Sequence, residues 1–365
     1  MVTTGAYYRM EAATTEEPFV GIHLPLDNDR SGQDRGRRTW RRAGLLVLLA
    51  GASMLVGLLL CELALRVAGF SYHLRPEKVE LGWPPSLAAL GEEYRPDPDL
   101  LWVRTEYSTT LAHARQERPV FAFLGDSCTE YGGYPELMLA NLTERHPGAR
   151  WTGVNLGTAG WSSYQGLRQL RRDVVPLHPR VATIYFGWND HWIGFGLPDE
   201  KVARLLDRTG TGWQDVRLVQ LAQKADIAAH RSANNRRVPL ADFRRNLDTM
   251  VRLAKSQGIE PVLLTAPSSH VPGWEPKELQ GRWLKRLQDL VPLHQSYVGA
   301  VRAVAREDGV VLCDLAREFE TLPPGPRRAA FLKDGIHFTR RGAKRAAAFL
   351  TDCLESSGVV DRASK

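Results

Sequence analysis

The stretch Pro119–Glu130, which reads PVFAFLGDSCTE, decides the fold. Its first six residues form a short apolar run without interruption, as expected for a strand that is buried on both faces of a sheet. Gly125 ends the run, and Asp126 and Ser127 follow directly. Polar residues in this position lie at the carboxyl end of a strand, where parallel sheets carry their functional sites.

Four similar apolar runs follow toward the C-terminus, separated by segments with helical periodicity. Strands that alternate with helices indicate a parallel sheet with helices on both faces. We therefore predict an α/β fold with five buried strands: Pro119–Leu124, Trp151–Leu156, Val181–Phe186, Glu260–Thr265 and Gly309–Cys313.

The clearest helical segment is Leu240–Gln257, which Gly258 ends. Its apolar residues recur at the spacing of one helix face. We expect that face to be buried through Phe243, Leu247, Met250, Val251 and Ala254.

Two motifs after the first strands offer a nucleophile and backbone donors. Ser127 follows a glycine at a strand end, so its hydroxyl can stand at the edge of the sheet, and the N-terminus of a following helix can direct N–H groups at an oxyanion. The turn from Asn155 to Trp161 contains Gly157 and Gly160, which allow a tight turn with exposed N–H groups. Taken singly, the serine could equally cap a helix and the turn could be an ordinary connection.

Two later motifs offer the remaining groups of acyl-transfer chemistry. Asn189, in Gly-Trp-Asn-Asp after the third strand, can donate a side-chain N–H, although an Asx turn is the plainer interpretation of the motif by itself. Asp334 and His337 lie three residues apart before the last helix, where the carboxylate can orient the imidazole as a base. A lone DxxH also occurs in ordinary surface loops. The combination of all four motifs at one edge of the sheet favours a catalytic site.

The order GDS, glycine, GxND and DxxH resembles the SGNH (GDSL) hydrolase family over about residues 119–352. The resemblance implies a flavodoxin-like three-layer α/β/α fold and no metal or organic cofactor. Cys128 departs from the small or aliphatic residue expected at its position.

Carried over residue by residue, the resemblance implies a role for each motif. Ser127 looks like the nucleophile, with Asp334 and His337 completing the triad. The oxyanion hole looks like the Ser127 N–H with Gly160 and Asn189, Gly157 being the less favoured glycine. We interpret Asp126 and Asp190 as backbone supports.

Aromatic residues and histidines near these motifs allow two interpretations. Trp161, Trp188 and Trp192 could bind substrate by stacking on a sugar ring or an acyl chain, or could pack in the core. His191 could line the pocket, but a surface position is favoured. No partner is evident for His270 or His294.

The N-terminal part of the chain contains nineteen uncharged residues, Ala43–Cys61, which is the length needed to span a bilayer. Residues 30–42, with six arginines and one acid, contribute +5 of the formal net charge of +7. Because positive flanks stay in the cytoplasm, we expect a single-pass membrane protein with its N-terminus inside and its catalytic domain outside. A cleaved signal peptide, a lipoprotein modified at Cys61 and a core helix of the soluble domain are the alternatives.

The remaining charge is close to balanced, so we expect no nucleic-acid partner. None of the four cysteines lies in a CxxC pair; we expect free thiols and no zinc site, although a disulfide remains open. The expected organisation is a disordered cytoplasmic tail at 1–42, a transmembrane anchor at 43–65, a linker leading into the domain at 66–118, and a hydrolase domain at 119–355 with an insertion at 197–238. The insertion is interpreted either as a lid or as an inert surface excursion.

These features predict a serine esterase that hydrolyses O-acyl esters, such as O-acetyl esters, on an extracytoplasmic glycan or lipid. An O-acyltransferase to a cell-envelope polysaccharide would use the same triad. An anchored binding module on an inactive hydrolase fold is a third hypothesis.

Overall fold

The structure is a computed structural model, and it describes residues 30–72, 93–209, 215–281 and 283–364. The chain forms two compact units, Met1–Cys61 and Glu62–Lys365, which we describe separately. Most of the disordered tail predicted for residues 1–42, and most of the first half of the predicted linker, lie outside the described residues.

A five-stranded parallel sheet forms the centre of the larger unit, in the order β4-β3-β5-β6-β7. The α/β fold with five parallel strands is therefore confirmed. The strands differ from their predicted ranges only at the ends: β3 (Phe121–Gly125), β4 (Gly153–Asn155), β5 (Val181–Tyr185), β6 (Glu260–Leu264) and β7 (Val311–Cys313).

Successive residues of the central strands point to opposite faces of the sheet. In β3, Ala122 and Leu124 belong to one hydrophobic cluster, and Phe121 and Phe123 belong to the other. This is the period-two alternation of a strand that is covered on both sides. It explains why the run in the sequence is apolar throughout.

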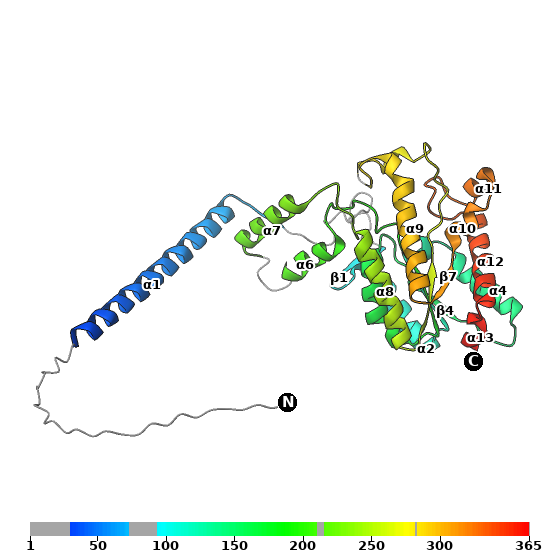
Figure 1. Cartoon of the computed structure of the whole chain (residues 1–365), viewed down its shortest axis with the longest axis horizontal. Helices are drawn as coiled ribbons and strands as arrows, with labels where there is room; N and C mark the ends of the chain where they lie inside the picture. The colour runs from blue at the N-terminus through cyan, green and yellow to red at the C-terminus, as the bar shows by residue number, and fades with distance from the viewer. Residues whose placement is uncertain (1–29, 73–92, 210–214, 282, 365) are drawn as a thin grey trace, which may run out of the picture. The chain divides into compact units, whose positions relative to one another are not determined.

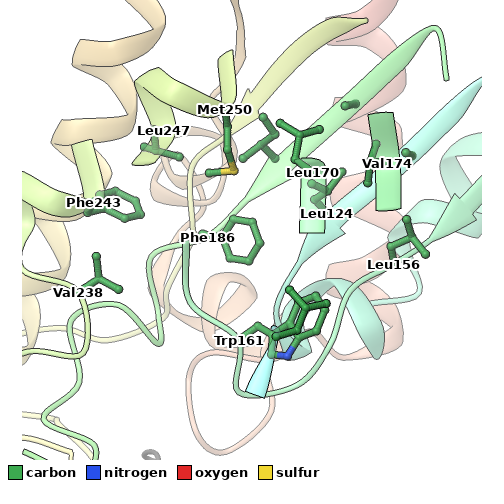
Figure 2. Packing of buried hydrophobic residues seen from close by; sticks show 14 of the residues in the cluster. Leu124, Leu156, Trp161, Leu170, Val174, Phe186, Val238, Phe243, Leu247 and Met250 are labelled. Atoms are coloured by element: carbon green, nitrogen blue, oxygen red, sulfur yellow. The ribbon is translucent and has the colours of Figure 1, made fainter. Parts of the chain in front are cut away.

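Helices from different parts of the chain cover the two faces. Figure 1 shows α8 (Leu240–Ser256) and α9 (Leu290–Glu307) on one side of the strands, and α4 (Tyr134–Arg145) and α12 (Arg340–Ser356) on the other. Figure 2 shows the first side from close by, where Phe243, Leu247 and Met250 of α8 belong to the same hydrophobic cluster as Leu124 of the sheet. All five residues predicted for the buried face of this helix are buried.

Shorter elements complete the larger unit. They are α2 (Tyr107–Glu117), α3 (Ser127–Glu130), α5 (Ser163–Gln169), α6 (Asp199–Thr209), α7 (Arg217–His230), α10 (Leu315–Glu320), α11 (Pro324–Ala329) and α13 (Val359–Ser364). A π-helical turn at Leu170–Val174 and 3₁₀ turns at Val175–Leu177, Lys277–Leu279 and Leu287–Asp289 lie between them.

The segment before β3 contributes more than the predicted linker. The strands β1 (Tyr94–Asp97) and β2 (Leu101–Arg104) pair antiparallel, and residues 100–103 are buried in the core. The packed domain thus begins before residue 119. The alternation of strands and helices in the sequence did not reveal this earlier start, because a β-hairpin followed by a short helix does not follow that alternation.

The expectation of four free thiols is wrong for two of them. Cys313 at the end of β7 and Cys353 in α12 form a disulfide, with their Cα atoms 5.8 Å apart. The helix packs against the edge strand of the sheet, so two cysteines forty positions apart in the chain become neighbours. Cys61 and Cys128 are free.

The helix α1 extends over Arg30–Val67. It begins well before the predicted anchor, so residues 30–42 are helical and not disordered; arginine favours helices, and a formed helix extends at low cost. Its portion Trp40–Val67 is long and apolar enough to cross a membrane, and its apolar window is not buried within the structure. A signal sequence near the N-terminus would meet the same criteria of length and composition.

Candidate active site

The turn after β3 presents Ser127 at the carboxyl edge of the sheet. The chain runs from β3 to β4 at one edge and returns to β5 on the other side of β3, so the strand order reverses at this position. Open α/β sheets bind their ligands at such a reversal. Ser127 is the first residue of α3 and is half-buried.

Two neighbours fix the conformation of this turn. Asp126 caps α3, because its Oδ1 accepts the N–H of Cys128 at 2.9 Å. A Cβ atom on Gly125 would lie 2.0 Å from the Thr129 hydroxyl oxygen, so only glycine lets α3 begin this close to the strand. Packing therefore requires the glycine of Gly-Asp-Ser, and the aspartate caps the helix that follows it.

A chain of hydrogen bonds connects the last loop of the domain to this serine. The Oδ2 atom of Asp334 lies 2.7 Å from Nδ1 of His337, and Nε2 of His337 lies 2.8 Å from the Oγ of Ser127. The other oxygen of Asp334 accepts the N–H groups of Ile336 and His337 at 2.9 and 3.1 Å. The carboxylate thus shapes its own loop while it holds the imidazole.

The pKa values in this relay are shifted in opposite directions. Burial lowers the pKa of His337, but the hydrogen bond and the charge of Asp334 act in the opposite direction, and the net pKa is above the ordinary value of 6.5. Burial raises the pKa of Asp334, and the hydrogen bonds from His337 and Ile336 more than offset this effect, so its net pKa is below 3.8. An ionised carboxylate beside an imidazole with a raised pKa is the electrostatic arrangement of a general base.

Backbone donors near the serine differ in their availability. The N–H of Gly157 donates to Asn155 Oδ1 at 3.1 Å. Within the described residues, the N–H groups of Ser127 and Gly160 have no acceptor. Gly160 has a φ of +78°. Glycine adopts this left-handed conformation without steric cost, so this position of the turn favours glycine. Of the two glycines, Gly160 is therefore the one whose N–H remains available to a ligand.

Asn189 follows β5 and is buried beside the same turn. Its Nδ2 donates to Asp126 Oδ2 at 3.2 Å, which uses one of its two N–H bonds. Burial raises the pKa of Asp126 to about 6, although the N–H of Cys128 and the charge of His337 oppose the shift. Asp190 accepts the N–H of Ser163 at 2.9 Å. Both acids hold backbone or amide groups in place, as the sequence suggested.

The turn that contains Gly160 is held by groups that the motifs did not include. The indole Nε1 of Trp102 donates to the carbonyl oxygen of Ala159 at 3.0 Å. This carbonyl and the Gly160 N–H belong to the same peptide unit. The guanidinium of Arg237 donates to Gly160 O at 2.6 Å and pairs with Asp199 at 2.8 Å. Arg237 and Asp199 are 1% and 0% exposed.

Sequence reasoning missed Trp102, Arg237 and Asp199. Arg237 ends the basic run RSANNRR, which was interpreted as part of a surface insertion, and Trp102 lies in the predicted linker. Nothing in the local sequence distinguishes them from surface or linker residues, because their partners are at least 37 positions away. The insertion 197–238 is thus tied to the site through its two ends, whichever of the two roles it has.

The three tryptophans do not offer an open face to a substrate. Trp161, Trp188 and Trp192 are 0%, 2% and 4% exposed, and all three belong to the hydrophobic clusters. The substrate-stacking interpretation is therefore corrected in favour of core packing. Figure 2 shows Trp161 within the cluster that covers one face of the sheet.

The remaining histidines are buried, which corrects the surface position predicted for His191. Its Nε2 lies 3.2 Å from Nδ1 of His294, whose Nε2 lies 2.9 Å from Ala266 O. His270 has partners too: its Nε2 lies 2.6 Å from the carbonyl oxygen of Asp334, so it supports the loop that carries the relay. Burial lowers the pKa of all three imidazoles.

Among the described residues, no group of His, Cys, Asp and Glu side chains has an arrangement that could hold a metal ion. The arrangement of Ser127, His337 and Asp334 can supply a nucleophile, a base and an orienting carboxylate from this chain's own residues.

Comparisons with known proteins identify one family. The model of the GDSL-like lipase/acylhydrolase family matches residues 123–345. No curated protein matches the chain.

Several solved structures are similar to this chain over most of their own length. A lipase/acylhydrolase from Enterococcus faecalis is 18% identical, with a TM-score of 0.44, and the match covers 65% of this chain and 96% of that one. A GDSL-like lipase from Bacteroides thetaiotaomicron is 18% identical, with a TM-score of 0.43 and coverage of 69% and 98%. An acetylxylan esterase from Geobacillus stearothermophilus is 18% identical, with a TM-score of 0.41 and coverage of 65% and 93%.

Proposed function

We propose that this chain, which belongs to the GDSL-like lipase/acylhydrolase family, hydrolyses O-acyl esters through Ser127, His337 and Asp334. The observation that carries the proposal is the continuous relay Asp334–His337–Ser127, with contacts of 2.7 and 2.8 Å. Residues 210 positions apart in the chain meet within hydrogen-bond distance, which a purely structural loop does not require.

In the first half of the reaction, Nε2 of His337 takes the proton of Ser127 as its Oγ bonds to the acyl carbon. The carbonyl oxygen becomes an oxyanion, which accepts hydrogen bonds from the Ser127 and Gly160 N–H groups and from Asn189 Nδ2. When the carbon–oxygen bond to the alcohol breaks, His337 returns the proton to the leaving alkoxide. An acylated serine and a free alcohol result.

In the second half, a water molecule gives a proton to His337 as it attacks the acylated serine. The same donors hold the second oxyanion. Its collapse releases the carboxylic acid and restores the Ser127 hydroxyl with the proton from His337. If a sugar hydroxyl replaced the water, the same groups would transfer the acyl chain.

We further propose that the reaction takes place outside the cytoplasm, on a glycan or lipid ester. Two independent features support this location. The apolar helix Trp40–Val67 follows an arginine-rich segment, which favours an N-terminus in the cytoplasm. The Cys313–Cys353 disulfide is typical of oxidising compartments.

A serine-reactive fluorophosphonate probe tests the nucleophile in the full chain purified in a neutral detergent. Wild-type protein should be labelled and should hydrolyse p-nitrophenyl acetate. Ser127→Ala should lose both labelling and hydrolysis with an unchanged melting temperature, and the control Ser108→Ala, an exposed serine of α2, should keep both. Labelling of Ser127→Ala at the wild-type rate would refute the assignment, and a wild type inert to both reagents would favour the inactive binding module.

A further inference from the structure

A groove of about 740 Å³ lies next to the loop that carries Asp334 and His337. One wall is the segment after β6, which contributes Ser269, His270, Val271, Trp274 and Pro276. The other is the segment around α11, which contributes Arg327, Arg328, Leu332, Lys333 and Gly335. The relay described above does not use this groove.

The residues that line the groove carry positive charge. Arg327, Arg328 and Lys333 line it, and no acidic residue does. In the described parts of the chain, none of these three cations has a carboxylate within ion-pair distance. Glu275, beside Trp274 in the chain, directs both carboxylate oxygens at the N–H of Gly273, 3.1 Å away. The groove is therefore built to attract an anion.

Arg327 is the most enclosed of the three cations. Its Nε donates to Ser268 O at 2.8 Å, which fixes the guanidinium, and within the described residues its two terminal nitrogens have no acceptor. Burial lowers the pKa of Arg327, and the charge of Glu320 opposes this only in part. A half-buried guanidinium with two free amino groups matches the paired oxygens of a carboxylate or phosphate.

The rim of the groove adds an apolar surface. Trp274 is 73% exposed, and the guanidinium of Arg328 lies 5.9 Å from its ring centroid. Val271 and Leu332 are exposed beside it. An exposed indole costs free energy in water unless a ligand covers it, and its flat face suits the C–H face of a sugar ring.

The groove and the relay share one loop. Gly335, in the groove wall, lies between Asp334 and His337 in the chain. Its φ is +72°, and a Cβ there would lie 2.6 Å from His270 Nε2, so the wall packs tightly on the imidazole that supports Asp334. A ligand bound in this groove would therefore lie against the loop that carries Asp334 and His337.

We infer that this groove binds the chain of an anionic, carboxylate-bearing glycan whose O-acyl group reaches Ser127. The inference rests on the proposed esterase function and names its substrate class. Arg327 and Arg328 pair with the carboxylates, Lys333 adds long-range attraction, and Trp274 stacks on a sugar ring. A neutral glycan would leave the enclosed cation of Arg327 without a partner.

The shape of the site favours a glycan over an anionic membrane. The cation with the most complete burial lies within a concave groove, where a flexible carboxylated chain can enter but a flat headgroup layer makes contact only at the rim. The exposed Trp274, Val271 and Leu332 are compatible with either, so binding to lipid vesicles is measured in the same experiment.

Assays with three substrates distinguish the contribution of the groove from that of the catalytic relay. The full chain in neutral detergent is assayed with O-acetylated oligogalacturonate, O-acetylated xylo-oligosaccharide and p-nitrophenyl acetate. Wild type should prefer the oligogalacturonate, and its KM for that substrate should rise with salt because exposed charges are screened. The double variant Arg328→Ala/Lys333→Ala should raise this KM by about tenfold, because it loses a charge-assisted contact. Trp274→Ala should raise it by a similar factor, because it loses a stacked ring.

Matched variants and readouts decide the outcome. Arg306→Ala/Lys344→Ala removes two exposed cations outside the groove and should leave all three KM values unchanged. The groove variants should keep wild-type activity on p-nitrophenyl acetate. An unchanged KM for oligogalacturonate in both groove variants overturns the inference, as does equal use of the two glycans by wild type. Loss of binding to phosphatidylglycerol vesicles with an unchanged glycan KM would instead identify a lipid surface.

Failure of the esterase proposal gives a different result. If wild type cleaves no ester at all, the chemistry is refuted, and equilibrium binding of unsubstituted oligogalacturonate to Ser127→Ala still tests the groove. If p-nitrophenyl acetate is cleaved and neither glycan is bound or cleaved, only the groove inference fails.

Discussion

The imidazole of His337 lies between a carboxylate and a serine hydroxyl, and its protonation should control activity. Only the neutral ring can accept the Ser127 proton. Because the net pKa of His337 is above 6.5, kcat/KM should fall with decreasing pH from a midpoint above 6.5. A pH profile of kcat/KM on p-nitrophenyl acetate measures this midpoint.

Substitution of Asp334 should change that profile in a defined direction. Asp334→Asn removes the charge that raises the pKa of His337 but leaves the burial that lowers it, so the acid midpoint should move to lower pH. The rate should fall by about 10³- to 10⁴-fold, less than for His337→Ala, since the ring remains but loses its orienting partner. A near wild-type rate for His337→Ala would mean that another group is the base.

The indole N–H of Trp102 should matter for the rate, because it binds the carbonyl of the peptide that ends in the Gly160 N–H. Trp102→Phe keeps an aromatic ring and removes that hydrogen bond. We expect kcat to fall by about tenfold with little change in KM. This decrease in kcat is smaller than the decrease caused by losing a whole oxyanion donor.

Trp151→Phe is the matched control for this prediction. Trp151 is also buried, but its Nε1 has no hydrogen-bond partner in the described structure. The same truncation should then lower stability without lowering kcat. Equal kcat values in both variants would show that Trp102 acts through packing alone.

At the scale of elements, the insertion between β5 and α8 is fixed to the site by one buried ion pair. Arg237, at its end, pairs with Asp199 at the start of α6, and the same guanidinium reaches Gly160 O. Removing one partner of such a pair leaves an uncompensated buried charge. Arg237→Met should therefore destabilise the domain by about 3–5 kcal/mol, measured by chemical denaturation.

A second substitution separates stability from positioning. Arg237→Met/Asp199→Asn removes both charges, so the free energy of unfolding should recover most of the loss. Because Gly160 O still lacks its donor, kcat should stay below wild type. Full recovery of kcat together with stability would show that the pair serves the fold only.

At the scale of the whole molecule, the disulfide should contribute to stability. It closes a loop with a sequence separation of 40, and the chain-entropy model gives a contribution of at most about 4 kcal/mol for a loop of that size. Cys313→Ala/Cys353→Ala should lower the melting temperature, and a reducing agent should lower that of wild type but not that of the variant. Cys128→Ala, which removes a free buried thiol, should respond to the reductant as wild type does.

The topology prediction also belongs to this scale. With the arginines before the span held in the cytoplasm, protease added to spheroplasts should digest the larger unit and leave a short N-terminal fragment. Protection of the entire chain would reverse the orientation. A free Cys313 thiol in protein taken from cells would argue against an oxidising compartment.

The sequence by itself determined the α/β class, the five strands and the gathering of Ser127, Asp334 and His337 at one sheet edge. The physical reason is that these are local signals. An apolar run of five or six residues, a helix face such as Phe243 to Ala254, and a polar motif directly after a strand each depend on neighbours in the chain. The parallel sheet then brings the strand ends together.

Only the tertiary structure decided the burial of Trp188 and His191, the pairing of Cys313 with Cys353, and the contacts of Trp102 and Arg237 with the Gly160 turn. Each of these depends on a partner far away in the chain, and packing chooses that partner after the sheet and its helices have formed. Arg237 is the clearest case: in the sequence it ends a basic run typical of a solvated surface, and in the structure it is a buried cation because Asp199 and Gly160 O compensate its charge.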